Sequence, residues 1–316
     1  MYWFFVALSI AGGLLTVVFF ALLVCFRMAY YSPTRKPRGP EEYPLPEGDI
    51  YLPFRDIMVG WMKEMRAMSS EAVSITSHDG LTLRGKYFEC TPGAPVELLI
   101  HGYRGEAERD MCGGIQRCFA LGHNALIVDQ RGSGFSDGHV ISFGVNEHRD
   151  CLAWVAFMVE HFGPDVKIIL TGISMGAATV LLAAGQPLPP QVKGVLADCG
   201  YSSAPEIIQK TIREMKLPCA IAYPFVRFAG RLFGGFDIED AIPMQAVRHA
   251  TVPIILIHGE ADTFVPCAMS REVYARCVSP ARLVTVPEAG HGLAFPQNQA
   301  QYLQVLREFW DEHGVK

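Results

Sequence analysis

The chain has 316 residues, of which 50% are hydrophobic and 19% are charged, and its formal net charge is −5 at pH 7. This length and hydrophobic content suit one large domain with a buried core plus an appendage. The slight acidic excess and the lack of a basic run exclude nucleic acid as a partner.

The N-terminal segment, residues 2–26, contains no charged side chain. At a rise of about 1.5 Å per residue, such a helix crosses the roughly 30 Å hydrocarbon core of a bilayer. A cleaved signal peptide would carry basic residues before its apolar run. Here they follow it, as Arg27, Arg35, Lys36 and Arg38. The pattern therefore predicts a single-pass transmembrane anchor over residues 1–30.

The same basic residues favour a cytoplasmic position for the flank that follows the span. The chain also has nine cysteines with no C-x-x-C pair. Their odd number and scatter suit a reducing compartment better than a disulfide framework. We therefore expect the catalytic domain to face the cytoplasm.

Residues 31–72 form a second segment. Its first part, residues 31–53, contains six prolines, so it is predicted to be an extended spacer rather than a helix. Residues 54–68 carry apolar side chains at helical spacing, which predicts an amphipathic helix. This helix would pack on its own domain or lie on the bilayer surface, and domain packing is favoured.

From residue 73 to the C-terminus, the sequence predicts an α/β domain. Residues 73–77 and 81–88 alternate around Asp79-Gly80, which predicts a β-hairpin. Apolar strands then alternate with helices, a pattern typical of a mostly parallel sheet covered on both faces. The further strands are predicted at residues 96–100, 125–128, 166–170, 192–196, 254–257 and 283–286. The helices are predicted at residues 114–120, 145–161, 175–184, 269–277 and 299–312.

Between residues 201 and 245 this alternation breaks, and two helical pieces are predicted at 206–216 and 220–233. An insertion at the carboxyl edge of such a sheet lies over the ligand crevice, so this one is predicted to be a helical cap. Its apolar residues would line an acyl pocket or, for most of them, pack in the core. They are Ile207, Ile208, Ile212, Ile221, Tyr223, Phe225, Phe228 and Phe233.

The pentapeptide GISMG, residues 172–176, lies between a predicted strand and a predicted helix. A serine at such a turn is strained, with its hydroxyl lifted clear of the sheet. Because a serine hydroxyl is a weak nucleophile by itself, Ser174 needs a base and an acid. Asp262 and His291 each follow a later strand, and the order serine, acid, histidine is that of α/β-hydrolases. Asp198, at the end of another strand, is the rival acid.

The oxyanion hole is expected to consist of two backbone N–H groups. One belongs to Met175, directly after the nucleophile. The other is assigned to Tyr103, in the loop that follows the strand at residues 96–100. No metal-ligand spacing and no phosphate-binding loop occurs in the sequence, so neither a metal nor a cofactor is expected.

Several polar residues near strand ends are interpreted as structural. His101 and His258 precede glycines and are expected to be buried. Asp129 and Arg131 are expected to stabilise loops. Cys199 follows a strand near the site, but no motif pairs it with a second histidine, so it too is expected to be structural.

These motifs resemble those of the α/β-hydrolase superfamily, in particular its lysophospholipase- and serine-aminopeptidase-like branch and bacterial membrane-anchored members of it. The likeness runs from about residue 73 to the C-terminus, and it implies an eight-stranded sheet with strand two antiparallel, a Ser174–Asp262–His291 triad and no cofactor. Tyr103 departs from the pattern, because many relatives have a smaller or amide residue there. The matching segments are residues 101–103, 129–136, 172–176, 258–262, 264–266 and 290–291.

The sequence thus predicts a membrane-anchored serine hydrolase that cleaves a carboxylic ester or thioester in a small-molecule or lipid-like acyl substrate. A serine aminopeptidase is the alternative within the same chemistry, with Glu206 or Glu239 binding the substrate amine. A non-catalytic binding module on the same fold is a second alternative. The sequence carries no signal for the oligomeric state.

Overall fold

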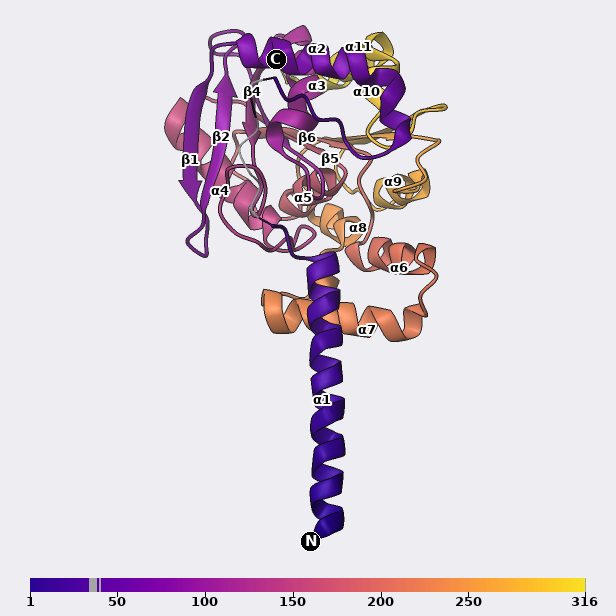
Figure 1. The fold of residues 1–316 in the computed structure, drawn as a ribbon. Coiled ribbons are helices and arrows are strands. Elements are labelled where there is room, and N and C mark those ends of the chain that lie inside the picture. The colour runs from indigo at the N-terminus through magenta and orange to yellow at the C-terminus, as the bar shows by residue number, and fades with distance from the viewer. Residues whose placement is uncertain (34–38, 40, 316) are drawn as a thin grey trace.

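The protein is described here by a computed structural model covering residues 1–33, 39 and 41–315. An eight-stranded sheet with the order β1-β2-β4-β3-β5-β6-β7-β8 forms its centre (Figure 1). Only β2 runs antiparallel to its neighbours, so the predicted α/β-hydrolase fold is confirmed. The strands are β1 (Glu71–Thr76), β2 (Thr82–Phe88), β3 (Val96–Ile100), β4 (Asn124–Val128), β5 (Ile168–Ile173), β6 (Val192–Asp198), β7 (Ile254–Gly259) and β8 (Ala281–Val286). The helices are α1 (Tyr2–Ala29), α2 (Arg55–Ala67), α3 (Ala107–Ala120), α4 (Glu147–Phe162), α5 (Met175–Ala184), α6 (Ala204–Glu214), α7 (Cys219–Ala229), α8 (Pro243–Ala246), α9 (Cys267–Tyr274), α10 (Ala294–Gln297) and α11 (Gln299–Glu312).

Successive strand residues point to opposite faces of the sheet, so their side chains belong to two separate hydrophobic cores. Leu99 belongs to the core under α2, α3 and α11, whereas Leu98 belongs to the core under α4 and α5. Both faces are therefore covered, which explains why the central strands are apolar at most of their positions.

Helix α2 was predicted either to pack on its own domain or to lie on the bilayer surface, and the structure shows the first. It packs on α3, and Trp61 stacks on Phe295 with ring centroids 5.5 Å apart. A side chain at Gly113 would come within 2.9 Å of the Trp61 ring. The helix therefore lies on its own domain. Helix α3 begins at Ala107, seven residues before the predicted start at 114. The glycines of α3, Gly113 and Gly114, lie inside the helix, where they allow close packing and do not mark its beginning.

Helix α1 is 28 residues long and is the one described helix long and apolar enough to cross a membrane. In Figure 1 it projects away from the domain, and only its C-terminal part is packed. There Leu22, Phe26 and Tyr30 are buried in one apolar cluster with residues of α7. Of the predicted spacer, residues 34–38 and 40, which include Arg35, Lys36 and Arg38, lie outside the described residues.

The two cap helices predicted from the sequence are α6 and α7, the latter continued by a π-helical turn, Gly230–Gly234. Helix α6 is capped by Ser203, whose hydroxyl accepts from the N–H of Glu206. Figure 1 places α7 across α1, on the side of the domain from which α1 projects.

Candidate active site

Ser174 lies in the sharp turn between β5 and α5. Its backbone has φ 57° and ψ −120°, a strained conformation for a residue with a side chain. A Cβ at Gly172 would lie 2.1 Å from the carbonyl oxygen of Gly176, and one at Gly176 would lie 2.0 Å from that of Ile100. Only glycines fit at these two positions, so the GISMG pattern is required by the close packing of strand, turn and helix.

Three predicted side chains meet at this turn. The Nε2 atom of His291 lies 2.9 Å from Oγ of Ser174, and Nδ1 of the same ring lies 2.6 Å from Oδ2 of Asp262. Asp262 follows β7 and His291 follows β8, so all three occupy the carboxyl edge of the sheet. The arrangement allows His291 to take a proton from Ser174 while Asp262 fixes its tautomer.

Asp262 is held as a carboxylate. Its Oδ1 accepts hydrogen bonds of 2.9 Å from the backbone N–H groups of Phe264 and Val265. Burial opposes its ionisation, but hydrogen bonds from His258 and His291 prevail and lower the pKa of Asp262 to about 2. A permanent negative charge therefore faces the imidazole of His291 and stabilises its protonated form.

The rival acid, Asp198, serves another purpose. Its Oδ2 accepts a 2.8 Å hydrogen bond from the Tyr302 hydroxyl, and burial raises its pKa. Its backbone oxygen accepts from the N–H of Ser174 at 2.8 Å. Asp198 thus supports the turn, while the bond to His291 is made by Asp262.

The two proposed oxyanion donors are backbone groups near Ser174. A Cβ at Gly102 would lie 3.3 Å from Cβ of Ser174, so the loop after β3 passes directly beside Ser174. Among the described residues, no carbonyl accepts from the N–H of Tyr103 or of Met175. Both donors are therefore available to a developing oxyanion.

The Tyr103 side chain has a contact that its sequence did not suggest. Its hydroxyl donates to the carbonyl of Ala29 at 2.8 Å, and its ring stacks on Phe143 with centroids 5.0 Å apart. Arg104, next in the loop, has φ 49° and donates to the carbonyls of Met28 and Tyr31 at 2.9 and 3.1 Å. The loop beside Ser174 is thereby tied to the end of α1.

His101 and His258 are fully buried, as expected. His101 donates from Nδ1 to the Gly102 carbonyl and accepts at Nε2 from the N–H of Gln130. Burial lowers its pKa, which keeps the ring neutral as these two bonds require. His258 donates from Nε2 to the carbonyl of Val265 at 2.8 Å, with Asp262 3.2 Å away. Both rings position the loops of the site.

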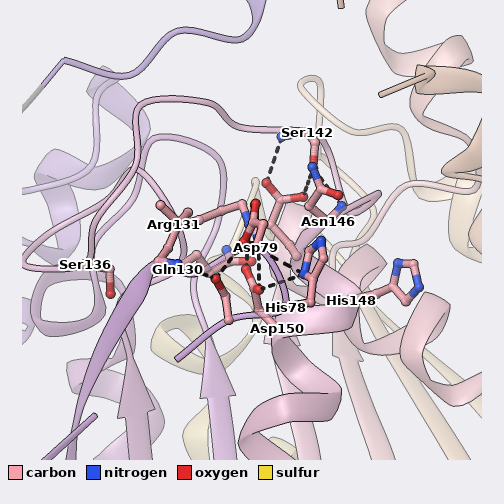
Figure 2. A network of polar contacts seen from close by, with 12 residues as sticks. His78, Asp79, Gln130, Arg131, Ser136, Ser142, Asn146, His148 and Asp150 are labelled. Carbon is pink, nitrogen blue, oxygen red and sulfur yellow. Dashed lines mark hydrogen bonds and ion pairs between the residues drawn. The ribbon is translucent and has the colours of Figure 1, made fainter. Parts of the chain in front are cut away.

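Figure 2 shows the polar network of the loop after β4. The Arg131 guanidinium lies between Asp150, at 2.6 and 2.7 Å, and Asp79 of the β1–β2 turn, at 2.8 and 3.1 Å. Asp129 accepts from the N–H groups of Ala107 and Phe135. These residues join loops, as the sequence predicted.

Two features were absent from the sequence interpretation. Tyr51, in a 3₁₀-helix ahead of α2, donates its hydroxyl to the His291 carbonyl at 3.0 Å. Phe264 lies edge-on to the His291 ring at 5.1 Å. The sequence separation of 240 residues between Tyr51 and His291 left no local signal for the first contact.

Cys199 is the third member of a group that resembles a metal-ligand set. The possible ligand atoms of Cys199, Asp262 and His291 lie within 4.8 Å of one another. However, burial raises the pKa of the Cys199 thiol well above its ordinary value, and a metal needs the thiolate. His291 and Asp262 already bond to each other. The donor set therefore fits a proton-transfer site better than a metal site.

The cap residues that the sequence offers for an acyl pocket differ in their burial. Ile207, Ile208 and Ile212 are buried in one cluster with Met175, the residue that follows Ser174. Ile221 and Phe228 point away from it and are exposed, so they do not line a pocket. Of the two acidic candidates for binding an amine, Glu239 accepts from the Tyr223 hydroxyl at 2.6 Å and Glu206 is exposed at the start of α6.

Comparisons with known proteins relate this chain to hydrolases. A sequence model described as the prolyl oligopeptidase family matches residues 115–315. The uncharacterized protein YqkD of Bacillus subtilis is 28% identical over 192 residues, which is 60% of this chain and 63% of YqkD. The rat palmitoyl-protein thioesterase ABHD10 is 28% identical over 205 residues, which is 59% of this chain and 65% of that protein. Both alignments span less than two thirds of the relative's own length.

Solved structures support the same fold. The esterase Pf2001 of Pyrococcus furiosus has a TM-score of 0.64 at 22% identity, covering 85% of this chain and 97% of its own. Est1E of Butyrivibrio proteoclasticus, solved with ferulic acid bound, has a TM-score of 0.60 at 22% identity and covers 77% and 100%. At these identities the likeness concerns the fold alone. The α/β-hydrolase resemblance is confirmed, while the matching family model differs from the branch that the motifs resemble.

Proposed function

Because the chain belongs to the prolyl oligopeptidase family, we propose that it is a serine hydrolase that cleaves carboxylic esters or thioesters through an acyl-enzyme on Ser174. The observation that carries this proposal is the pair of contacts at His291, 2.9 Å to Ser174 and 2.6 Å to Asp262. A base placed between a serine hydroxyl and a buried carboxylate is the arrangement that activates a serine.

In the proposed reaction, Oγ of Ser174 attacks the substrate carbonyl while Nε2 of His291 takes its proton. The negative charge that develops on the carbonyl oxygen is met by the N–H groups of Tyr103 and Met175. His291 then returns the proton to the leaving alcohol or thiol, and the acyl group stays on Ser174. A water molecule, deprotonated by His291, attacks this acyl-enzyme, and His291 then gives the proton to Oγ of Ser174 as the acid is released.

An acyl ester substrate is favoured over a peptide by the surroundings of the nucleophile. Met175 belongs to an apolar cluster that includes Ile207 and Ile208 of the cap and the buried end of α1. Apolar surroundings of this kind suit an acyl chain better than a charged peptide terminus. The esterase and thioesterase relatives agree with this choice. The serine aminopeptidase-like branch remains the alternative, with the family name and an acylaminoacyl peptidase fold neighbour in its favour.

We also propose that α1 anchors the protein in a membrane, with the domain on the cytoplasmic side. The helix is long and apolar enough, and Arg27 follows at the end that enters the domain. A signal sequence would pass the same test of length and composition. The packing of Leu22 and Tyr30 into the domain favours a retained helix.

The test uses the full chain in detergent micelles. A fluorophosphonate probe should label the wild type and not the Ser174→Ala variant. Cys199→Ser serves as the matched control, since it changes a neighbouring buried nucleophile that the mechanism does not use. Labelling retained in Ser174→Ala would refute the assignment of the nucleophile. Turnover of p-nitrophenyl acyl esters against aminoacyl p-nitroanilides then separates esterase from aminopeptidase.

A further inference from the structure

The outward face of α7 carries an apolar stripe that the catalytic proposal does not use. Leu217, Ile221, Pro224, Phe228 and Leu232 follow one another at intervals of three or four residues, so they share one side of the helix and its flanking turns. All five are exposed, Ile221 by 63% and Phe228 by 52%. The opposite side of α7 packs on α6 and α1. A stripe of this kind marks an interaction surface.

The position of α7 relative to α1 indicates what covers this stripe. The Phe233 ring, just after α7, contacts the rings of Phe19 and Phe26 of α1, with centroids 5.8 and 5.5 Å apart. Figure 1 shows α7 lying across α1, and only the N-terminal part of α1 extends beyond it. The stripe therefore lies where α1 leaves the domain.

The exposed length of α1 fixes the level at which a bilayer would end. Apart from the half-buried Val6, its residues are exposed from Tyr2 to Phe20, and burial begins around Leu22. These roughly 20 residues span about 30 Å, which is the thickness of the hydrocarbon core. Tyr2 and Trp3 would then lie at the far interface, where aromatic rings are favoured, and the near interface falls at the level of α7.

We propose that the α7 stripe is buried in the near interface of the bilayer that α1 crosses, so that the domain rests on the membrane through two elements. This rests on the membrane anchoring proposed above. Arg27 lies about one turn beyond Leu22, at the level of lipid headgroups, where a cation is stabilised by phosphates. A bilayer is favoured over a protein partner because the stripe is continuous with a surface that α1 already commits to lipid.

This arrangement also places the apolar surroundings of Ser174 on the side of the domain that faces the bilayer. The apolar cluster that joins Leu22 of α1 and Val226 of α7 includes Met175. Tyr103, which lies beside Ser174, is bonded to the last turn of α1. The substrate class that follows is an acyl ester or thioester that partitions into the bilayer.

The experiment measures tryptophan quenching in the full chain, reconstituted into phosphatidylcholine vesicles whose acyl chains carry bromine either near the headgroup or near the chain end. The variant Trp3→Phe removes the one exposed tryptophan, since Trp61, Trp154 and Trp310 are buried. Phe228→Trp is added on this background, and Ile221→Trp is a second probe position. The control is Val278→Trp. Val278 is 68% exposed and lies just before the amino end of β8, whereas the cap lies at the carboxyl ends of the strands. Fluorophosphonate labelling of each variant reports folding independently of lipid contact.

We expect bromine near the headgroup to quench Phe228→Trp more strongly than bromine near the chain end, and to a degree comparable with Trp3 of the wild type. The Val278→Trp emission should not change. Quenching of Trp3 without quenching at positions 228 and 221 would overturn the proposal and leave the anchor intact, and it would direct attention to a protein partner for the stripe. Loss of quenching at all three positions would overturn the anchor as well. In either case, labelling of Ser174 would still stand as a separate result for the hydrolase proposal.

Discussion

The end of α1 is predicted to be part of the hydrolase core, and Tyr30 tests this most directly. Tyr30 is 0% exposed and its ring contacts those of Phe26, Phe143 and Phe236, with centroids 6.0, 6.0 and 5.0 Å apart. Removing an aromatic ring from a core costs about 3–5 kcal/mol. Against a total stability of about 5–15 kcal/mol, Tyr30→Ala should lower the melting temperature by roughly 5–15 °C.

Two variants separate ring packing from other effects. The Tyr30 hydroxyl is buried without a hydrogen-bond partner among the described residues, so Tyr30→Phe should leave stability unchanged or raise it slightly. Tyr2→Ala removes the same side chain from a site that is 72% exposed, and it should melt like the wild type. Melting is measured by differential scanning fluorimetry in one detergent. If Tyr30→Ala melts together with Tyr2→Ala, or Tyr30→Phe is as damaging as Tyr30→Ala, the end of α1 is not part of the core.

Three further predictions concern the site and its support. Asp262→Asn should lower ester turnover by about 10³–10⁴-fold with the fold intact, and a loss below tenfold would contradict the role of this carboxylate. Glu97→Gln should destabilise by about 3–5 kcal/mol, because it leaves the buried Arg117 cation uncompensated. Burial opposes ionisation of Glu97, but Arg117 and its other partners lower its pKa to about 2. Its contribution is therefore complete above the ordinary value of 4.5 and is lost as the pH falls toward 2, so the urea midpoints of wild type and Glu97→Gln should converge there. Tyr103→Phe keeps the backbone donor but loses the hydrogen bond to the Ala29 carbonyl. Its kcat should therefore fall, by less than the hundredfold typical of a lost oxyanion donor, with KM unchanged. An unchanged kcat would show that this hydrogen bond does not position the loop.

Much of the fold was predictable because its signals are local. The strand at residues 96–100 and the helices at 175–184 and 299–312 have the predicted bounds, since each is a segment rich in apolar residues with turn-forming residues near its ends. The start of α3 was misplaced because Gly113 and Gly114 look like a helix boundary by composition. In the structure they allow Trp61 and Leu99 to approach the helix closely, a reason that only tertiary contact reveals.

The same distinction applies to the site. Ser174, Asp262 and His291 come together because parallel strands place their carboxyl ends along one edge, which follows from the order of the elements. The supporting contacts do not follow from that order. The Tyr51 hydroxyl reaches the His291 backbone from 240 residues away, and no periodicity encodes such a pair. The roles of the three side chains remain predictions that the labelling experiment addresses.

The contacts between α1 and the loop after β3 serve two purposes: they satisfy the last carbonyls of α1, and they hold the loop that carries the proposed oxyanion donor. The last carbonyls of a helix have no partner within the helix and need donors from elsewhere. Here the donors are the Tyr103 hydroxyl and the Arg104 guanidinium, and the Tyr103 backbone is the proposed oxyanion donor. Moving α1 relative to the domain would leave these carbonyls without donors. Arg104, whose backbone has a positive φ, would lose its hydrogen bonds to the end of α1. A soluble form that keeps the surroundings of Ser174 therefore has to begin near residue 21, ahead of Leu22, rather than after the proline-rich segment.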